Sequence, residues 1–462
     1  MLNSLAVSIL LLAFFASVSF NGFFRNIAEK NNFLIDIPDK SRKFHFRATP
    51  LTGGLGIFFG ILISAILIGG LTEANYSLDP SNKGFFENSQ FNERPISKNF
   101  KVDDKNYELS LNKASDKKVS VEITTNEKSL GQSSNNVDIV PLSDQKFKAI
   151  LPNGDEKIYL VESDRVIEIS SLNETVDIFS TKNTDNINLS NFSISLYICA
   201  LLIMIFMIFD DFLTIKPILR LLFQFFISAL MIGMSGEYIS NIGNLLGTGD
   251  INLGILSIPF TIFCVVGIMN AFNMIDGLNG ICAALALIPI TYLTFLGNFS
   301  YGLLIPIGAI LGFLAYNLGY FGKKRRVFLG DSGSNMLGFA VAFVCIEYSQ
   351  NISHSSYINP VTALWLVSIP LVDCIAVMTS RAINGIMPFR PGREHLHHRL
   401  LNIGIKPKII LFIIVFSSIL FSCLGFLIEL IYPDKEYISF YAFCSLSLFY
   451  YFLSKNSIKA NV

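Results

Sequence analysis

Long apolar stretches occupy most of this 462-residue chain. Hydrophobic residues make up 52% of the sequence and charged residues only 15%, a balance that is unusual for a water-soluble domain. Each stretch is close to the ~20 residues that an α-helix needs to cross a bilayer. The stretches lie at residues 3–22, 50–71, 193–209, 218–236, 255–271, 280–297, 302–320, 332–349, 360–380, 409–431 and 437–454. The sequence therefore predicts an all-α polytopic membrane protein with about eleven transmembrane helices.

Residues 72–192 differ in composition and predict an insert between two membrane-embedded segments, 1–71 and 193–462. The insert contains 14 Lys and Arg against 20 Asp and Glu. Hydrophobic and polar residues alternate, as in half-buried strands, at 118–124, 147–151, 157–161 and 166–169. We therefore expect a small β-rich module, which serves either as a solvated decoration or as a docking or oligomerisation surface.

Basic residues set the predicted orientation of the helices. With the N-terminus outside and the spans alternating, nearly all Lys and Arg beyond the insert fall in inner loops or at inner helix ends. This distribution obeys the positive-inside rule and places the insert outside the cytoplasm. The first span lacks a positive charge before its apolar core, so we interpret it as a transmembrane helix and not as a signal peptide.

Four polar clusters stand at the ends of apolar spans, and the same alternation places all four on the inner side. Asp, Asn and His are costly near hydrocarbon unless they have a partner or a function. The clusters are Asp210–Asp211, Asn270–Gly280, Phe328–Ser334 and Arg393–Arg399. Their common side predicts one active site assembled from separate helices.

The first cluster is a pair of adjacent acids, Asp210 and Asp211. Neighbouring residues of a helix point about 100° apart, so one carboxylate can face a reacting group while the other holds a cation or a basic partner. A simple cap that ends the helix would give the same pair. Arg220 follows on the next predicted helix, where its guanidinium can clamp phosphate oxygens.

The second and third clusters contain candidate metal ligands. Asn270, Asn273 and Asp276 are spaced so that they lie near one helical face. Amide and carboxylate oxygens suit Mg²⁺, although a packed polar patch between helices would look the same. Asp331 opens an apolar span and is the best single candidate for a metal ligand. Phe328, just before it, is positioned either to stack on a nucleobase or to anchor the chain at the membrane interface.

The fourth cluster contains three of the five histidines, His395, His397 and His398, beside Arg393. Such a cluster can hold a diphosphate or pass a proton. Zinc is the alternative for three histidines, but no Cys accompanies them and the arginines favour an anionic ligand. The seven cysteines all lie in apolar spans, so we expect neither disulfides nor a thiolate metal site.

Together these motifs resemble the polyprenyl-phosphate sugar-1-phosphate transferases. The resemblance rests on Arg42-Lys43-x-His45, Asp210-Asp211, Asn270-Ala-Phe-Asn273-Met-Ile-Asp276-Gly277, Phe328-x-Gly330-Asp331-Ser-Gly333-Ser334 and His395-x-His397-His398. It covers nearly the whole chain except the insert, and it is closest to the branch that transfers N-acetylglucosamine 1-phosphate to undecaprenyl phosphate. It implies attack of a polyprenyl phosphate on the β-phosphate of a UDP-sugar, release of UMP, and a lipid-linked diphosphate sugar that starts a cell-envelope glycan.

The resemblance also implies roles for individual residues. Asp331 and Asn273 would hold Mg²⁺, with Mn²⁺ as an alternative. Asp210 and Asp211 would lie near the lipid phosphate, and Arg220 would clamp phosphates. The catalytic group would also include His395, His397 and His398. The remaining substrate-binding residues would be Asp36, Lys43, Arg47, Asp276, Asn279, Asn317, Phe328 and Arg393, with Phe328 stacked on uracil and with Asn279 and Asn317 near the nucleoside.

Two departures from the family pattern matter. Asn279 stands where the family often carries Asp, which makes it a reader of the base and not an acid or base. The insert is the second departure, and it faces away from the expected chemistry.

The expected partners are a UDP-N-acetyl sugar, undecaprenyl phosphate and the bilayer of the inner membrane. No nucleic acid is expected, and homodimer formation is left open. The peptidoglycan branch of the family, which accepts UDP-MurNAc-pentapeptide, is the first alternative. That branch usually carries Pro-x-His-His-His, whereas this chain has His395 in place of the Pro. A non-catalytic scaffold or a transporter is the second alternative, but the polar groups gather on one side and no internal repeat is evident.

Overall fold

The computed structural model divides the chain into two units, which we describe separately. One unit comprises Met1–Gly69 with Asn188–Val462, and the other comprises Gly70–Ile187. Lys43 lies outside the described residues. The structure describes residues 4–37, 47–78, 96–102, 105–115, 118–125, 138–143, 146–150, 156–162, 165–169, 175–180, 191–213, 215–295, 301–350, 358–387, 392–433 and 435–461.

The smaller unit contains two antiparallel sheets, one with the strand order β3-β4-β5 and the other with the order β10-β9-β8-β7-β6. Each strand pairs with its neighbour in sequence, so both sheets are meanders. The strands are β3 (Ile96–Val102), β4 (Lys105–Ser115), β5 (Lys118–Thr125), β6 (Asp138–Ser143), β7 (Lys146–Ile150), β8 (Glu156–Glu162), β9 (Arg165–Ile169) and β10 (Thr175–Ser180).

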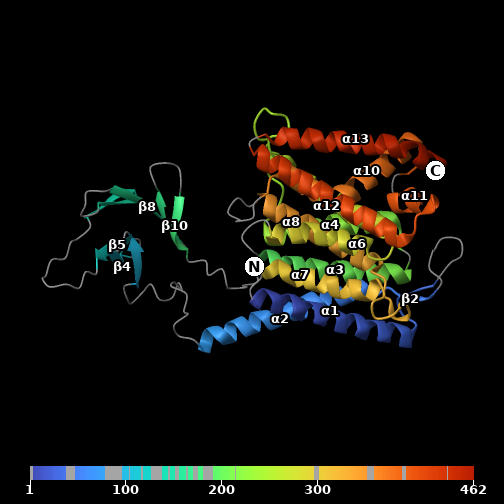
Figure 1. Ribbon diagram of the computed structural model, residues 1–462, viewed down its shortest axis with the longest axis horizontal. Coiled ribbons are helices and arrows are strands. Elements are labelled where there is room, and N and C mark those ends of the chain that lie inside the picture. Colours follow the sequence, from blue (N-terminus) through green and yellow to red (C-terminus); the bar gives the residue numbers. More distant parts are fainter. Residues whose placement is uncertain are drawn as a thin grey trace. The chain divides into compact units, whose positions relative to one another are not determined.

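The larger unit is a bundle of helices (Figure 1). A two-stranded ribbon, β1 (Ile35–Asp36) with β2 (Thr49–Pro50), joins the first two helices. The helices are α1 (Ser4–Asn31), α2 (Gly53–Leu78), α3 (Asn191–Leu213), α4 (Pro217–Ser235), α5 (Ser257–Ile275), α6 (Ile281–Phe295), α7 (Tyr301–Asn317), α8 (Gly330–Gln350), α9 (Pro360–Leu366), α10 (Ser368–Ile383), α11 (Leu396–Asn402), α12 (Pro407–Ile431) and α13 (Glu436–Asn461).

The protein is a polytopic all-α membrane protein, and each expected span coincides at least in part with a helix. Within the described residues, six helices are long and apolar enough to cross a membrane, or seven if one bent pair counts as a span. Three further apolar helices, Gly53–Ile68, Ile281–Phe295 and Gly302–Asn317, are shorter. The number of eleven spans stays a prediction.

The expected span at 360–380 consists of two helices with a break between them. The chain breaks between α9 and α10, and the two helices meet at an angle of 82°. Val367 leaves the helical conformation, with φ −110° and ψ 18°. Pro370 explains the break, because it has no N–H to donate to the carbonyl of Leu366 and its ring would clash with that carbonyl in a continuous helix. In the first turn of α10 the missing donor costs nothing.

Helix α8 is the centre of the bundle. It packs against α3, α5 and α6, and its Phe339 and Phe343 are fully buried. Gly338 lets α5 approach closely, since a β-carbon there would lie 2.9 Å from the Cα atom of Met269. Burial on all sides is consistent with a helix that is hydrophobic around most of its circumference.

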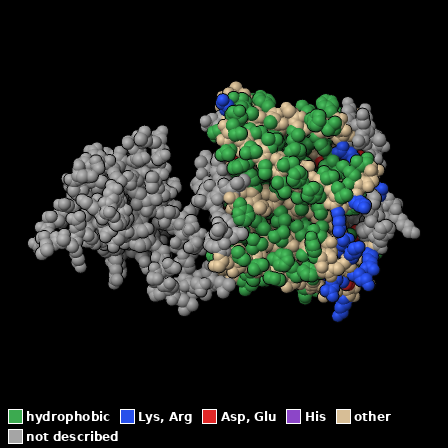
Figure 2. Space-filling view, viewed as in Figure 1, with side chains coloured by type: hydrophobic (Ala, Val, Ile, Leu, Met, Phe, Trp, Pro, Cys, Tyr) green, Lys and Arg blue, Asp and Glu red, His purple; other side chains and the backbone are tan. Residues whose placement is uncertain are grey.

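The polar clusters meet at one end of this bundle. The ends of α3 and α5 lie there, together with the starts of α2, α4 and α8. The ribbon strand β2 and helix α11 mark this end in Figure 1. Lys and Arg side chains gather at the same end, whereas hydrophobic side chains cover most of the face of the bundle that Figure 2 shows. A polar, basic end on an apolar cylinder is the arrangement of a protein whose site faces water at a membrane surface.

Candidate active site

The ribbon after α1 forms one wall of the site. Asp36 pairs with Thr49 across the ribbon. The N–H of Phe328 donates to the carbonyl of Pro50 over 2.8 Å, and the N–H of Gly53 donates to the carbonyl of Phe328 over 2.9 Å. These bonds fix the ribbon against the segment before α8, where Asp36 acts electrostatically on Asp331. Arg47 lies two residues before Thr49, the first residue of β2, at the same wall.

The first turns of α2 and α8 touch through glycine. A β-carbon on Gly54 would lie 2.6 Å from the Cα atom of Gly333, a distance that side chains do not allow. Glycine at both positions therefore permits backbone contact between the two helix starts. The contact brings the ribbon and Asp331 into one site.

Arg220 links two of the predicted acids. Its Nε lies 2.8 Å from Oδ2 of Asp210, and its Nη1 lies 3.5 Å from Oδ2 of Asp331. The other oxygen of Asp210 accepts the N–H of Ile215 over 2.9 Å. Asp210 is 2% exposed, whereas the side chains of Arg220 and Asp331 are 37% and 45% exposed. Asp210 thus holds the guanidinium from inside, while Arg220 and Asp331 are partly exposed, so that a substrate can reach them.

The second acid of the pair, Asp211, continues α3 beside Asp210. Its side chain lies outside the described residues. Its expected place near a lipid phosphate stays a prediction.

A buried row of amides lies beneath Arg220. Asn270 Nδ2 donates to Oε1 of Gln224, and Gln224 Nε2 donates to Oδ1 of Asn335, both over 2.8 Å. Asn335 Nδ2 donates to the carbonyl of Asp331 over 2.8 Å. Gln224 and Asn335 were not among the expected residues. Gln224 lies one helical turn after Arg220, on the same face of α4, and this spacing could have identified it.

The end of α5 supplies Asn273 and Asp276. Asn273 Nδ2 donates to Oγ of Ser334 over 3.0 Å, which joins α5 to the first turn of α8. Asp276 follows the last residue of α5 as its C-cap. Burial, and then the nearby Asp331 carboxylate, raise the pKa of Asp276 to about 8. Asn279, in the next turn, precedes Gly280, whose φ of +84° is a conformation that favours glycine.

These residues fit a divalent cation with hard oxygen ligands. Asp331 offers a partly exposed carboxylate, and Asp36 and Asp210 place further negative charge near it. Within the described ranges, no group of three or more His, Cys, Asp or Glu side chains could hold a metal ion. A cation held by Asp331 and Asn273 would complete its shell with water and substrate oxygens, as Mg²⁺ does.

Phe328 lies in the short segment before α8, and the residues on either side of it are buried. Val327 and Leu329 are 0% and 3% exposed, whereas Phe328 is only half-buried. Asn317, at the end of α7, is 3% exposed and donates its amide to the carbonyl of Val327 over 2.8 Å. Asn317 thus holds the segment that carries Phe328. Its expected place near a nucleoside stays a prediction.

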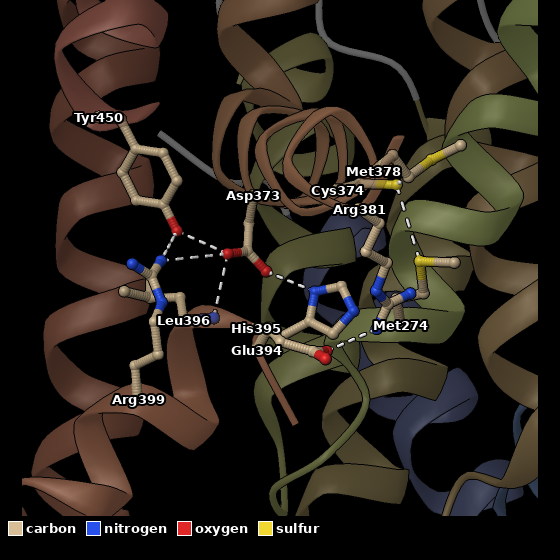
Figure 3. A network of polar contacts seen from close by, with 10 residues as sticks. All are labelled: Met274, Asp373, Cys374, Met378, Arg381, Glu394, His395, Leu396, Arg399 and Tyr450. Atoms are coloured by element: carbon tan, nitrogen blue, oxygen red, sulfur yellow. Dashed lines mark hydrogen bonds and ion pairs between the residues drawn. The ribbon is translucent and has the colours of Figure 1, made fainter. Parts of the chain in front are cut away.

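The histidine loop is tied to α10 and α13 by a buried network (Figure 3). Oδ2 of Asp373 lies 2.9 Å from Nδ1 of His395. Oδ1 of Asp373 accepts the N–H of Leu396 over 3.0 Å and the hydroxyl of Tyr450 over 2.5 Å. Arg399 lies 3.4 Å from the same oxygen and also donates to the Tyr450 hydroxyl. One carboxylate therefore anchors the loop to two helices.

A second ion pair holds the start of the loop. Arg381, in the last turn of α10, lies 2.5 Å from Glu394, and both side chains are buried. Gly392 makes room for the pair, because a β-carbon there would collide with both side chains. Arg393, next to Glu394, is exposed at the mouth of the loop.

His397 reaches back to the end of α5. A β-carbon on Gly277 would collide with Nε2 of His397, so the ring packs directly on the glycine that follows Asp276. His397 is 1% exposed, and neither of its ring nitrogens has a hydrogen-bond partner in the described part of the chain. Burial lowers the pKa of His397 to about 3 and that of His398 to about 4. Both rings are therefore neutral near pH 7.

Sequence reasoning did not single out Asp373, Arg381 or Tyr450. An acid within an apolar span is a signal in itself, because it is costly there without a partner. Asp373 in the span 360–380 carried that signal. Its partner Tyr450 is 77 positions away on another helix, and only the fold shows that they meet.

Comparison with known proteins adds independent evidence. The family model of glycosyl transferase family 4 matches residues 193–349. An undecaprenyl-phosphate alpha-N-acetylglucosaminyl 1-phosphate transferase of Escherichia coli O157:H7 is 32% identical over 272 residues, which cover 57% of this chain and 74% of the relative. The protein of the same name from Haemophilus influenzae is 33% identical over 255 residues, which cover 53% of this chain and 70% of the relative. The family match includes Asp210 and Asp331 and ends before Asp373.

Proposed function

The chain belongs to glycosyl transferase family 4, and we propose that it transfers N-acetylglucosamine 1-phosphate from UDP-GlcNAc to undecaprenyl phosphate. In this reaction an oxygen of the lipid phosphate bonds to the β-phosphorus of the donor. The bond between that phosphorus and the bridging oxygen breaks, and the electron pair leaves with UMP. The lipid-linked diphosphate sugar then starts a cell-envelope glycan.

The observation that carries the proposal is the position of Arg220 between Asp210 and Asp331. Its guanidinium is oriented from inside by Asp210 and is partly open on the other side. Phosphoryl transfer needs positioning and electrostatic stabilisation more than covalent chemistry by the protein. Arg220 can bind phosphate oxygens of either substrate. Both oxygens of Asp210 are already engaged, one by Arg220 and the other by the N–H of Ile215. Asp211 is then the acid of the pair that serves the lipid phosphate.

Asp331 and Asn273 are the residues that would hold Mg²⁺, or Mn²⁺ in its place. The cation would neutralise the diphosphate and polarise its oxygens. Phe328 would stack on uracil with Asn279 near the base, and the loop with Arg393, His395, His397 and His398 would bind the diphosphate or the sugar. Asp36, Arg47 and Asp276 would line the remaining wall, together with Lys43.

A direct assay tests this proposal. Purified protein with undecaprenyl phosphate, Mg²⁺ and UDP-GlcNAc should release UMP, and chelation of the metal should stop the release. UDP-MurNAc-pentapeptide and other UDP-N-acetyl sugars serve as competing donors. Asp331→Ala should abolish turnover. Absence of UMP release with every donor would rule out the enzyme, and a preference for UDP-MurNAc-pentapeptide would move the chain to the peptidoglycan branch.

We also propose that the site faces the cytoplasm and that the insert lies on the opposite side of the inner membrane. The site contains the start of α2 and the end of α3, whereas the insert joins the other ends of these two helices. Lys and Arg gather at the site's end, as the positive-inside rule requires. A reporter domain that works only outside the cytoplasm should be active when it is placed within 126–137. A cytoplasmic reporter would overturn the orientation.

A further inference from the structure

Asp373 accepts hydrogen bonds from groups that can only donate. A backbone N–H and a guanidinium have no acceptor atom, and both Leu396 and Arg399 contact Oδ1 in this way. The hydroxyl of Tyr450 already accepts from Arg399, so its hydrogen points to the same oxygen. A carboxylate with three donors on one oxygen, one of them a guanidinium, is ionised and has no hydrogen to give.

The fourth contact of Asp373 then fixes the tautomer of a histidine. Oδ2 lies 2.9 Å from Nδ1 of His395, and because the carboxylate cannot donate, the hydrogen of this bond belongs to Nδ1. When the ring carries a single hydrogen, its place on Nδ1 leaves a lone pair on Nε2. Among the described residues, Nε2 of His395 has no hydrogen-bond partner.

The ring of His395 belongs to the site. It lies nearly parallel to the ring of His397, with a centroid distance of 6.3 Å. His397 in turn packs on Gly277, next to Asp276 at the end of α5. A nitrogen with a lone pair is a poor ligand for the anionic diphosphate but a good acceptor for a hydroxyl or amide N–H of a sugar.

We infer that Asp373 is a positioning residue that keeps the hydrogen of His395 on Nδ1 and so presents Nε2 as an acceptor to a hydroxyl or N–H group of the donor sugar. Tyr450 and Arg399 hold Asp373 in place from α13 and α11. The identity of the sugar rests on the proposed function, whereas the tautomer does not.

Asp373→Asn is the decisive change because it alters the donor pattern and almost none of the shape. The amide oxygen would turn to the three donors at the Oδ1 position. The amide NH₂ would then face His395 and donate to Nδ1. The ring would have to move its hydrogen to Nε2, which would present a donor in place of an acceptor.

Nitrogen NMR of ¹⁵N-histidine-labelled protein tests the tautomer without any assay of activity. The chain has five histidines, so the His395 signals can be assigned by their absence in His395→Gln. We expect the hydrogen on Nδ1 in the wild type and on Nε2 in Asp373→Asn. A wild-type ring with a hydrogen on Nε2, alone or in addition to the one on Nδ1, would overturn the inference, whether or not the protein releases UMP.

Steady-state kinetics test the consequence for the substrate. In Asp373→Asn, kcat/KM for UDP-GlcNAc should fall roughly 10- to 100-fold, the usual effect of a mismatched buried hydrogen bond. The KM for undecaprenyl phosphate should stay the same. A merely structural role would instead raise both KM values or lower the active fraction of the enzyme.

A double variant separates positioning from general damage. If Asp373 acts through His395, Asp373→Asn combined with His395→Gln should be no worse than His395→Gln alone. Additive losses would contradict the inference. Tyr450→Phe keeps the carboxylate and should retain the Nδ1 tautomer, which provides a second test should Asp373→Asn fail to fold. Tyr441→Phe, on the exposed face of α13, is the matched control.

Discussion

At the scale of single residues, Arg220 is the side chain with the most specific geometry. Its Nε and Nη1 contact two different carboxylates, Asp210 and Asp331. A lysine ammonium is a point charge on a flexible stem and cannot keep both contacts while binding phosphate. We therefore expect Arg220→Lys to lower UMP release roughly 10- to 100-fold with little change in melting temperature. Arg325→Lys, an exposed residue before α8, is the control, and equal activity of the two variants would refute the role of Arg220.

His397 and His398 predict how stability depends on pH. Burial lowers their pKa values to about 3 and about 4, whereas an unfolded chain binds protons at these residues near pH 6.5. Their surroundings include His395, Arg393, Glu394 and Asp373. Below pH 6.5 the unfolded state takes up protons that the folded state refuses, so stability falls as pH drops from about 6.5 towards 4. His397→Gln should reduce this fall in melting temperature between pH 7 and pH 5, and an unchanged slope would contradict the assignment.

At the scale of elements, the amide row couples α4, α5 and α8. Gln224 donates to Asn335 and accepts from Asn270, and all three groups lie between helices. Gln224→Leu would remove one hydrogen-bond partner from Asn270 and one from Asn335, at a cost of about 1–3 kcal/mol each. We expect a clear drop in melting temperature and a loss of activity, since Asn335 also holds the carbonyl of Asp331. Met234→Leu, on the exposed face of α4, should change neither quantity.

A single proline determines where the helix in the expected span 360–380 breaks. Apolar composition alone predicts one helix there, but Pro370 denies the hydrogen bond that continuity needs. The chain bends by 82°, and the bend separates α9 from the helix that carries Asp373 and Arg381. These two side chains lie about two turns apart on α10 and hold consecutive residues of the histidine loop, Glu394 and His395.

At the scale of the whole molecule, the insert and the helical unit are separate compact units. The site takes its described residues only from the helical unit. We expect replacement of 79–187 by a Gly/Ser linker to retain most of the UMP release, provided that the shortened protein reaches the membrane. Membrane fractions of equal protein content measure this. A folded but inactive deletion variant would show that the insert contributes to the reaction.

The sequence by itself determined the class of the protein and which polar residues stand at helix ends. Apolar length and basic loops were sufficient for a membrane-embedded helical protein, because the bilayer constrains every span in the same way. Position at the ends of apolar spans marked Asp210, Asp331 and the histidines. Spacing marked Asn273, because side chains a turn apart share a helical face whatever the rest of the chain does.

Only the tertiary structure decided which of these residues touch. It joined Arg220 to Asp331 and Asp373 to Tyr450, which are 111 and 77 positions apart. It also gave Asn317 a backbone partner and His397 a neighbour at Gly277. Such contacts depend on how helices pack around α8, and packing is a property of all the side chains together, which no local pattern contains.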